Sequence, residues 1–183
     1  MKKPIITSIL ITASLLATLP VHAQQKRLSP HETVSAVVDG NRVTIVYGRP
    51  HTIKPGTSEV RQIWGGLVPY GKIWRLGADE ATLLITQKPI EIGGTTVPAG
   101  AYTLFMLPQE NEPSKLVINK QLGQWGLQYN EGQDLARVDL KKQTVDEPVA
   151  QFTMAIQKEP SGGGLLKLTW EKTEFSVTFS VQK

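Results

Sequence analysis

The chain contains no cysteine among its 183 residues. This absence excludes disulfide bonds, zinc held by cysteine and a thiol nucleophile at the same time. Histidine is almost as scarce, because only His31 and His51 follow the N-terminal apolar segment, too few for a zinc site built from several histidines. A Gly-x-Ser-x-Gly elbow, a phosphate loop and a dinucleotide fingerprint are missing as well. The sequence therefore predicts no metal and no cofactor.

The sequence also lacks an excess of charge of one sign. Two of the 20 Lys and Arg residues lie within residues 1–23, which leaves 18 basic residues against 16 acidic ones in the remainder of the chain. Such a balance gives no electrostatic reason to bind DNA or RNA. We therefore expect no nucleic-acid partner.

Only one long apolar run is present, at residues 5–19, after two lysines and before the small residues that end at Ala23. It is shorter than the roughly 18 to 20 residues that a membrane-spanning helix needs. The pattern is typical of a cleavable secretory signal over residues 1–23, with an uncleaved N-terminal anchor as the alternative. We expect a bacterial protein exported to the periplasm or the extracellular space, with no transmembrane segment after cleavage. A lead segment at 24–33 and one domain at 34–183 follow.

Short runs of alternating apolar and polar residues fill the remainder of the chain. Residues 34–38 and 42–47 flank Asp39-Gly40-Asn41, and an Asp-Gly pair supplies the backbone angles of a tight hairpin. Residues 82–87 and 90–92 are further predicted strands. In residues 101–107 both faces are mostly apolar, which predicts a central strand covered on both sides.

The C-terminal third has the most regular alternation. Period-two patterns cover four segments: residues 136–141, 151–157, 166–171 and 175–181. Turn residues at 161–164 and 171–173 join the last three strands, which predicts an antiparallel meander. No segment carries a helical stripe, although residues 121–128 are compatible with one helical turn. The sequence thus predicts an all-β fold of nine or ten short strands, either an antiparallel β-sandwich or a jelly-roll-like barrel.

The most unusual segment lies at residues 63–82. It combines four glycines with two tryptophans, a tyrosine, an arginine and an adjacent pair of carboxylates. The side chains concerned are Trp64, Tyr70, Trp74, Arg75, Asp79 and Glu80. Two interpretations stay open: the aromatic residues fill the core and the segment is a packed corner, or the segment forms a partly open cleft that binds a ligand.

Several short motifs follow one another along the chain, and the first is Tyr47-Gly48-Arg49-Pro50. The others are the block at 66–71, Trp74-Arg75, the block at 77–82, Pro98-Ala99-Gly100 with residues 101–105, Asn119-Lys120 and Gln124-Trp125-Gly126. Over about residues 29–156 the chain resembles the exported bacterial family called domain of unknown function 2911. The resemblance implies export and a compact, largely β domain, and it transfers no catalytic residue. The chain departs from the family at Asp79, where Asn is more usual, and at residues 54–60, where it has extra loop residues.

Asp79 and Glu80 are neighbours, and neighbours on an extended strand point to opposite faces. We therefore expect that they do not act together as acid and base unless the backbone turns. The parity of the following strand places Asp79 at the edge of the buried face, where a carboxylate needs a partner. Arg75 is the nearest cation, and its planar fork suits a bidentate contact. An ion pair between Arg75 and Asp79 that holds a bend is the expected result.

Arg49 and His51 form a second candidate constellation, separated by Pro50. The proline fixes an extended exit from the strand, which is expected to aim both side chains off the rim of the sheet. If the central block shares that rim, one cleft contains both groups. Otherwise His51 is an ordinary solvated or hydrogen-bonded residue. A further candidate wall, or a capped bend, consists of Asn119, Lys120, Gln124 and Trp125.

Three functions remain open. The first is a non-catalytic β domain that binds a small-molecule or glycan ligand. Its candidate residues are Arg49, His51, Trp64, Tyr70, Trp74, Arg75, Asp79 and Glu80. The second is a hydrolase that uses Asp79 or Glu80 with His51 as acid or base and Arg75 as anion stabiliser. The third is a structural component of the cell envelope, and the oligomeric state is left open.

Overall fold

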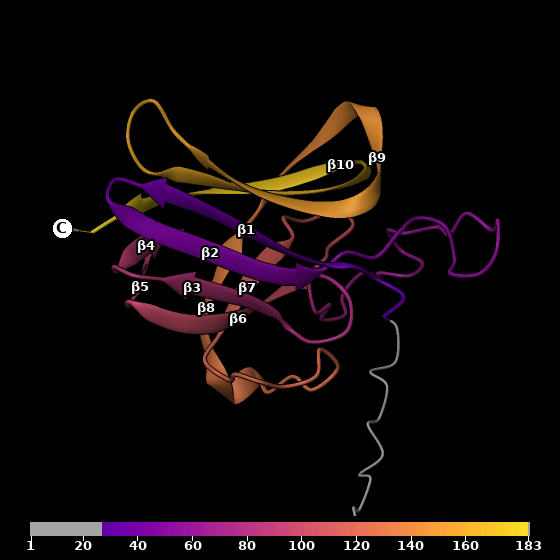
Figure 1. Ribbon diagram of the computed structural model, residues 1–183, viewed down its shortest axis with the longest axis horizontal. Helices are drawn as coiled ribbons and strands as arrows, with labels where there is room; N and C mark the ends of the chain where they lie inside the picture. Colours follow the sequence, from indigo (N-terminus) through magenta and orange to yellow (C-terminus); the bar gives the residue numbers. More distant parts are fainter. Residues whose placement is uncertain (1–26, 183) are drawn as a thin grey trace, which may run out of the picture.

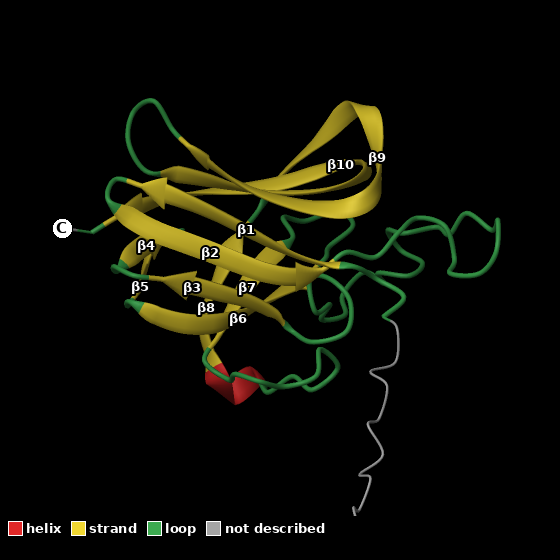
Figure 2. Ribbon diagram, in the orientation of Figure 1, coloured by secondary structure: helices red, strands yellow, loops and turns green. Residues whose placement is uncertain are grey.

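Two antiparallel sheets face each other in the computed structural model, which describes residues 27–182 (Figures 1 and 2). The larger sheet has the order β1-β2-β3-β6-β7-β8. Its strands are β1 (His31–Val38), β2 (Asn41–Gly48), β3 (Thr82–Thr86), β6 (Gly100–Leu107), β7 (Lys115–Asn119) and β8 (Asp134–Asp139). The smaller sheet has the order β5-β4-β10-β9, with β5 (Thr95–Val97), β4 (Ile90–Ile92), β10 (Gly164–Val181) and β9 (Lys141–Lys158). The fold is an all-β sandwich and not a closed barrel, which decides between the two predicted architectures.

The first hairpin confirms the prediction from its turn residues. Asp39 and Gly40 have φ values of 47° and 74°, the left-handed angles that a two-residue hairpin needs. They pair Val38 with Asn41 and set the register of the whole hairpin, so that His31 lies opposite Gly48. The start of β1 is therefore fixed beside the end of β2.

The main core lies between the two sheets. It consists of the inward-facing residues of both, including the completely buried Leu104 and Trp170. A second, smaller cluster covers the outer face of the larger sheet, where loop residues pack on Phe105 and Val117. Strand β6 is thus buried on both faces, as its composition predicts.

The C-terminal meander is present as predicted. Residues 164–181 are one continuous strand, β10, which pairs with β9 and folds back on itself at Glu171, so that Lys167 pairs with Glu174 at 2.7 Å and Gly164 lies against the ring of Phe179 (Figure 1). The register with β9 shifts on both sides of Glu171, whose φ is 51°, a left-handed angle of the kind that a tight hairpin turn needs. Trp170 is buried before the turn and Phe175 after it, so the break in alternation marks the turn that the sequence predicts.

The predicted helical turn at residues 121–128 is also wrong. That stretch is irregular, and the single helical turn in the part of the chain that the structure describes is η1 (Glu131–Gln133). The side chain of Asn130 caps η1 by accepting a hydrogen bond from the backbone N–H of Gly132. Among residues 27–182, no helix is long and apolar enough to span a membrane. The predicted signal peptide lies outside the described residues.

Candidate functional site

A groove of about 310 Å³ lies on the outer face of the larger sheet, at the end where β1, β2 and β3 meet two loops. Its floor includes Val46, Leu83 and Thr103, which stand opposite one another on three adjacent strands. His31, Glu80 and Gln124 are among the residues that line its sides. We call this feature the His31 groove.

Gly48 allows the loop of residues 76–80 to approach this groove. A Cβ atom at position 48 would collide with the carbonyl oxygen of Ala78, so the loop backbone occupies the space of the missing side chain. The backbone N–H of Ala78 donates to the carbonyl of Gly48 at 3.2 Å. Because Gly48 lies opposite His31 in the hairpin, this contact brings the loop to the side of His31.

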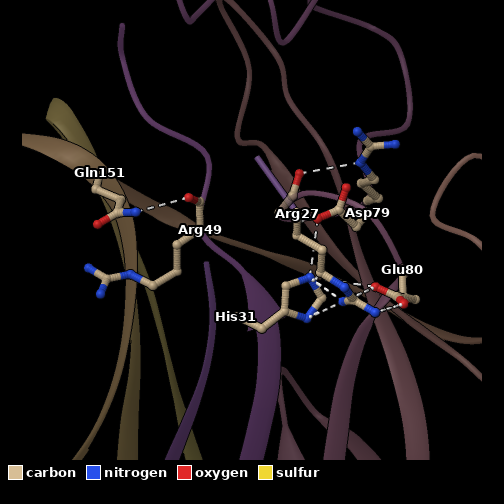
Figure 3. Close-up of polar contacts among 8 residues, drawn as sticks. Arg27, His31, Arg49, Asp79, Glu80 and Gln151 are labelled. Carbon is tan, nitrogen blue, oxygen red and sulfur yellow. Dashed lines mark hydrogen bonds and ion pairs between the residues drawn. The ribbon is translucent and has the colours of Figure 1, made fainter. Parts of the chain in front are cut away.

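Asp79 is not extended, and this overturns the predicted orientation of the two carboxylates. Its φ is 66°, in the left-handed region. Nε2 of His31 lies 3.2 Å from Oδ2 of Asp79 and 3.5 Å from Oε2 of Glu80 (Figure 3). The period-two argument therefore fails here, because it holds only for an extended backbone. The two neighbouring carboxylates converge on one imidazole.

Arg27 completes this charged cluster. Its Nη1 and Nη2 donate to Oε2 and Oε1 of Glu80 at 2.7 and 2.5 Å, and Nη1 also lies 2.7 Å from Nε2 of His31 (Figure 3). Partial burial raises the pKa of Glu80. The hydrogen bonds from its own backbone N–H and from Arg27 outweigh this effect, so the pKa lies below its usual value. Glu80 is therefore held as a carboxylate.

The predicted ion pair between Arg75 and Asp79 is wrong. Nε of Arg75 donates to the carbonyl of Gly77 at 3.4 Å, and its stem lies against Gly126, where a Cβ atom would collide with it. The basic side chain that contacts Asp79 is that of His31, which lies 48 residues earlier in the chain. Sequence proximity suggested Arg75, but the hairpin places His31 closer.

Gln124 has the least satisfied polar group of the groove. Its side chain is buried, with 6% of the residue exposed, and Nε2 donates to the hydroxyl of Thr103 at 3.1 Å. The hydroxyl of Thr103 in turn donates to the carbonyl of Gln121. Within residues 27–182, Oε1 of Gln124 has no hydrogen-bond partner. A buried acceptor without a partner is costly, so this atom identifies a position where a donor is missing.

Trp125 lies at the edge of the same region. It forms an isolated antiparallel bridge with Glu80, and 46% of the residue is exposed. The next residue, Gly126, donates its N–H to the carbonyl of Asp79 at 3.0 Å. These backbone contacts place the exposed residue Trp125 next to the loop that carries the two carboxylates.

Trp64, Tyr70 and Trp74 do not line the His31 groove. Trp64 and Trp74 pack edge to face at 6.0 Å, and Trp74 stacks on the core residue Trp170 at 5.8 Å. Both side chains pack against the main core, as the packed-corner interpretation predicts. Tyr70 is half-buried and lies against Gly65. The two tryptophans of the central block thus belong to the core, whereas Glu80 lines the groove and Asp79 lies beside it, at His31.

Arg49 does not point off the rim, in contrast to the prediction. Its guanidinium donates to the carbonyl of Phe152 at 3.1 Å and to the hydroxyl of Thr153 at 2.8 Å, and it pairs with Glu32 at 2.7 Å. Tyr47 joins this Arg49 cluster, because its hydroxyl accepts from the N–H of Met154. Burial raises the pKa of the Tyr47 hydroxyl. The cluster ties β2 to β9 across the edge of the sandwich.

His51 is exposed, and its Nδ1 accepts a hydrogen bond from the N–H of Ile53 at 3.0 Å. In residues 27–182 no ion pair or hydrogen bond joins it to Asp79 or Glu80, and it does not line the His31 groove. The histidine beside the carboxylates is His31. No group of three His, Cys, Asp or Glu side chains in the described part of the chain is placed to hold a metal ion.

Sequence reasoning missed His31 and Arg27 as members of the site. The predicted first strand began at residue 34, whereas β1 begins at His31, and the hairpin register then places His31 opposite Gly48. The site also requires the loop of residues 76–80 to fold onto Gly48, and no local pattern predicts that contact.

One family model, described as "Protein of unknown function (DUF2911)", matches residues 29–179. No curated protein and no solved structure matches the chain. The match spans nearly the whole sandwich, including the Arg49 cluster and the residues of the His31 groove other than Arg27.

Proposed function

Because the chain belongs to the DUF2911 family, whose description names no activity, we propose a function from the geometry of the His31 groove itself: the domain binds a small, hydroxyl-rich ligand such as a saccharide. The observation that carries the proposal is the unpaired acceptor of Gln124 in the groove wall. A ligand hydroxyl would supply the missing donor.

The other groups around the groove favour the same chemistry. The carboxylates of Asp79 and Glu80 are strong acceptors for hydroxyl donors, and Arg27 offers donors to ligand oxygens. Trp125 adds an exposed aromatic face of the kind that packs on the apolar face of a sugar ring. A groove with a partly apolar floor and a few converging polar groups is the usual form of a small-ligand site.

The test is a calorimetric titration of the protein with neutral saccharides, namely glucose, galactose, N-acetylglucosamine and cellobiose. We expect at least one to bind, and Gln124→Met to weaken that binding at least tenfold, because methionine keeps the volume but removes the acceptor. Trp125→Ala should weaken it by a similar factor.

Leu127→Ala is the matched control, since Leu127 is 78% exposed in the same loop and does not line the groove. It should leave the affinity unchanged. Failure of every saccharide to bind, or equal affinity of Gln124→Met and the unaltered protein, would contradict the proposal.

Hydrolysis of the bound ligand is a second candidate function, favoured by the distance of 3.2 Å between Nε2 of His31 and Oδ2 of Asp79. Such a pair can move a proton. Incubation with cellobiose and measurement of released glucose tests it. Release that is lost in His31→Gln would support catalysis, and no release would leave binding alone.

The proposed binding takes place outside the cytoplasm, because residues 1–23 have the pattern of a signal peptide. Expression of the full chain in a bacterium, followed by mass measurement of the exported protein, tests this. An N-terminus at Gln24 is expected, and an intact chain retained in the cytoplasm would contradict it.

A further inference from the structure

A second feature of the fold is independent of the His31 groove. In the middle of β10, Glu171 has a φ of 51°, and the pairing register with β9 shifts on both sides of it. Glycine adopts this backbone conformation without steric cost, whereas glutamate does not. This residue lies at the turn where β10 folds back on itself, and the turn alone gives no reason for a glutamate at this position.

The carboxylate of Glu171 is also unusual in having no partner. Glu171 is half-buried, yet no hydrogen bond or ion pair reaches its carboxylate from any of residues 27–182. Burial raises its pKa. Glu174 on the same strand shows the contrast, because Lys167 and Gln143 each donate to its carboxylate at 2.7 Å.

Glu171 lines a groove of about 550 Å³, which we call the Glu171 groove. The neighbouring Lys172 lines it too, and no described ion pair involves its ammonium group. One wall is apolar and consists of Val60, Pro148, Val149 and Ala150. Val60 belongs to the loop that follows β2. The N–H of Thr52 in this loop donates to the carbonyl of Ala150 in β9, near the place where β9 and β10 curl (Figure 1).

The geometry points to a site for a small zwitterion with an aliphatic side chain, that is, a free apolar amino acid. The ligand ammonium meets the carboxylate of Glu171, and the ligand carboxylate meets the ammonium of Lys172. The aliphatic side chain packs on Val60 and Pro148, where 70% of Val60 is exposed in the absence of a ligand. The volume of the groove lies in the range of small-molecule sites.

The experiment is an NMR titration of the ¹⁵N-labelled protein with L-leucine. We expect saturable shifts of the amide signals of Ala150, Glu171 and Thr173. N-acetyl-L-leucine lacks the ammonium group and L-leucinamide lacks the carboxylate, so each should bind at least fivefold more weakly. Tight binding of L-leucinamide with weak binding of N-acetyl-L-leucine would reject the contact with Lys172 and identify an amine, or the N-terminus of a peptide, as the ligand.

Glu171→Gln should weaken L-leucine binding at least tenfold, and Lys172→Gln at least threefold. Asp146→Asn, a matched change at an exposed position of β9 that does not line the groove, should leave the affinity unchanged. If Glu171→Gln does not fold, Lys172→Gln and Val60→Ser test the same site at exposed positions. Equal binding of L-leucine and N-acetyl-L-leucine, unchanged affinity in the site variants, or no shift at saturating L-leucine would overturn the inference. None of these results bears on saccharide binding in the His31 groove.

Discussion

The Arg49 cluster and the His31 groove contain the same kinds of side chain, but they use them differently. Arg49 is held by a backbone carbonyl, a hydroxyl and one carboxylate, all within 3.1 Å. The side-chain contacts of Arg27 and His31 in the groove are with other ionisable side chains that are 25% to 43% exposed. Ion pairs at exposed sites contribute little to stability. The first arrangement therefore fastens the sandwich, whereas the second leaves charged groups available to a ligand.

Gly48 lies between the two regions, and its replacement should have the largest effect. In Gly48→Ala the added Cβ meets the carbonyl of Ala78, which cannot move without lifting the loop that carries Asp79. We expect a loss of about 3 kcal/mol in the free energy of unfolding, the upper part of the range for overpacking. Urea unfolding measures it.

Gly56→Ala is the control for Gly48→Ala. Gly56 has a φ of 75° but no atom within 4 Å of an added Cβ, so only backbone strain of about 1 kcal/mol is expected. Equal losses in the two variants would mean that the close approach at Gly48 carries no special cost.

Arg49→Met should have the next largest effect on the free energy of unfolding. It leaves the carbonyl of Phe152 and the hydroxyl of Thr153 without their donor at the edge of the sandwich, whereas Glu32, which is 43% exposed, can be solvated by water as Glu80 can. We expect a loss of about 2 kcal/mol, because a partly buried acceptor loses a charge-assisted hydrogen bond. Thermal unfolding with far-ultraviolet circular dichroism measures it. A loss below about 0.5 kcal/mol would remove the distinction between the two regions.

Arg27→Met is the matched change in the groove. Its partner Glu80 is 43% exposed and can be solvated by water, so we expect a change in stability of less than about 0.5 kcal/mol. The same unfolding assay measures it beside Arg49→Met. A loss as large as that of Arg49→Met would show that the groove charges fasten the fold as well.

The pH dependence of stability should show the smallest effect. The folded pKa of Glu80 lies below its usual value of 4.5, so its contribution to stability is complete above the unfolded pKa and is lost as the pH falls through the folded pKa. Because the side chain of Glu80 is 43% exposed and its charge is screened by water, we expect less than about 0.5 kcal/mol. Urea unfolding at pH 7 and at pH 3, compared with Glu80→Gln, measures it. The stability advantage of the unaltered protein over Glu80→Gln should shrink from pH 7 to pH 3. An advantage that grows at pH 3 would contradict the prediction.

Much of the fold can be predicted from local patterns. The Asp39-Gly40 turn, the alternation in β2 and the two-sided apolar composition of β6 each predicted what the structure has. The error in the central block concerns a residue with positive φ outside glycine. At Asp79 the backbone leaves the extended region, and the period-two rule fails there.

The candidate site was predicted less well, because its members come from three separate parts of the chain. Asp79 and Glu80 were identified, and Gln124 was named as a further wall, but Arg75 and His51 were assigned as their partners in place of Arg27 and His31. Nearness in sequence is a poor guide where a loop folds over a sheet. The choice of partner depends on which strand end lies beneath the loop.

The sequence by itself determined the all-β class and the first hairpin, because turn residues and alternation act over a few neighbouring residues. Only the tertiary structure decided that Gly48 receives the backbone of Ala78, that Asp79 turns its carboxylate toward His31, and that Gln124 keeps an acceptor without a partner. These outcomes depend on contacts between residues more than 20 positions apart in the chain. Such contacts are fixed by packing the whole sandwich, and no local pattern records them.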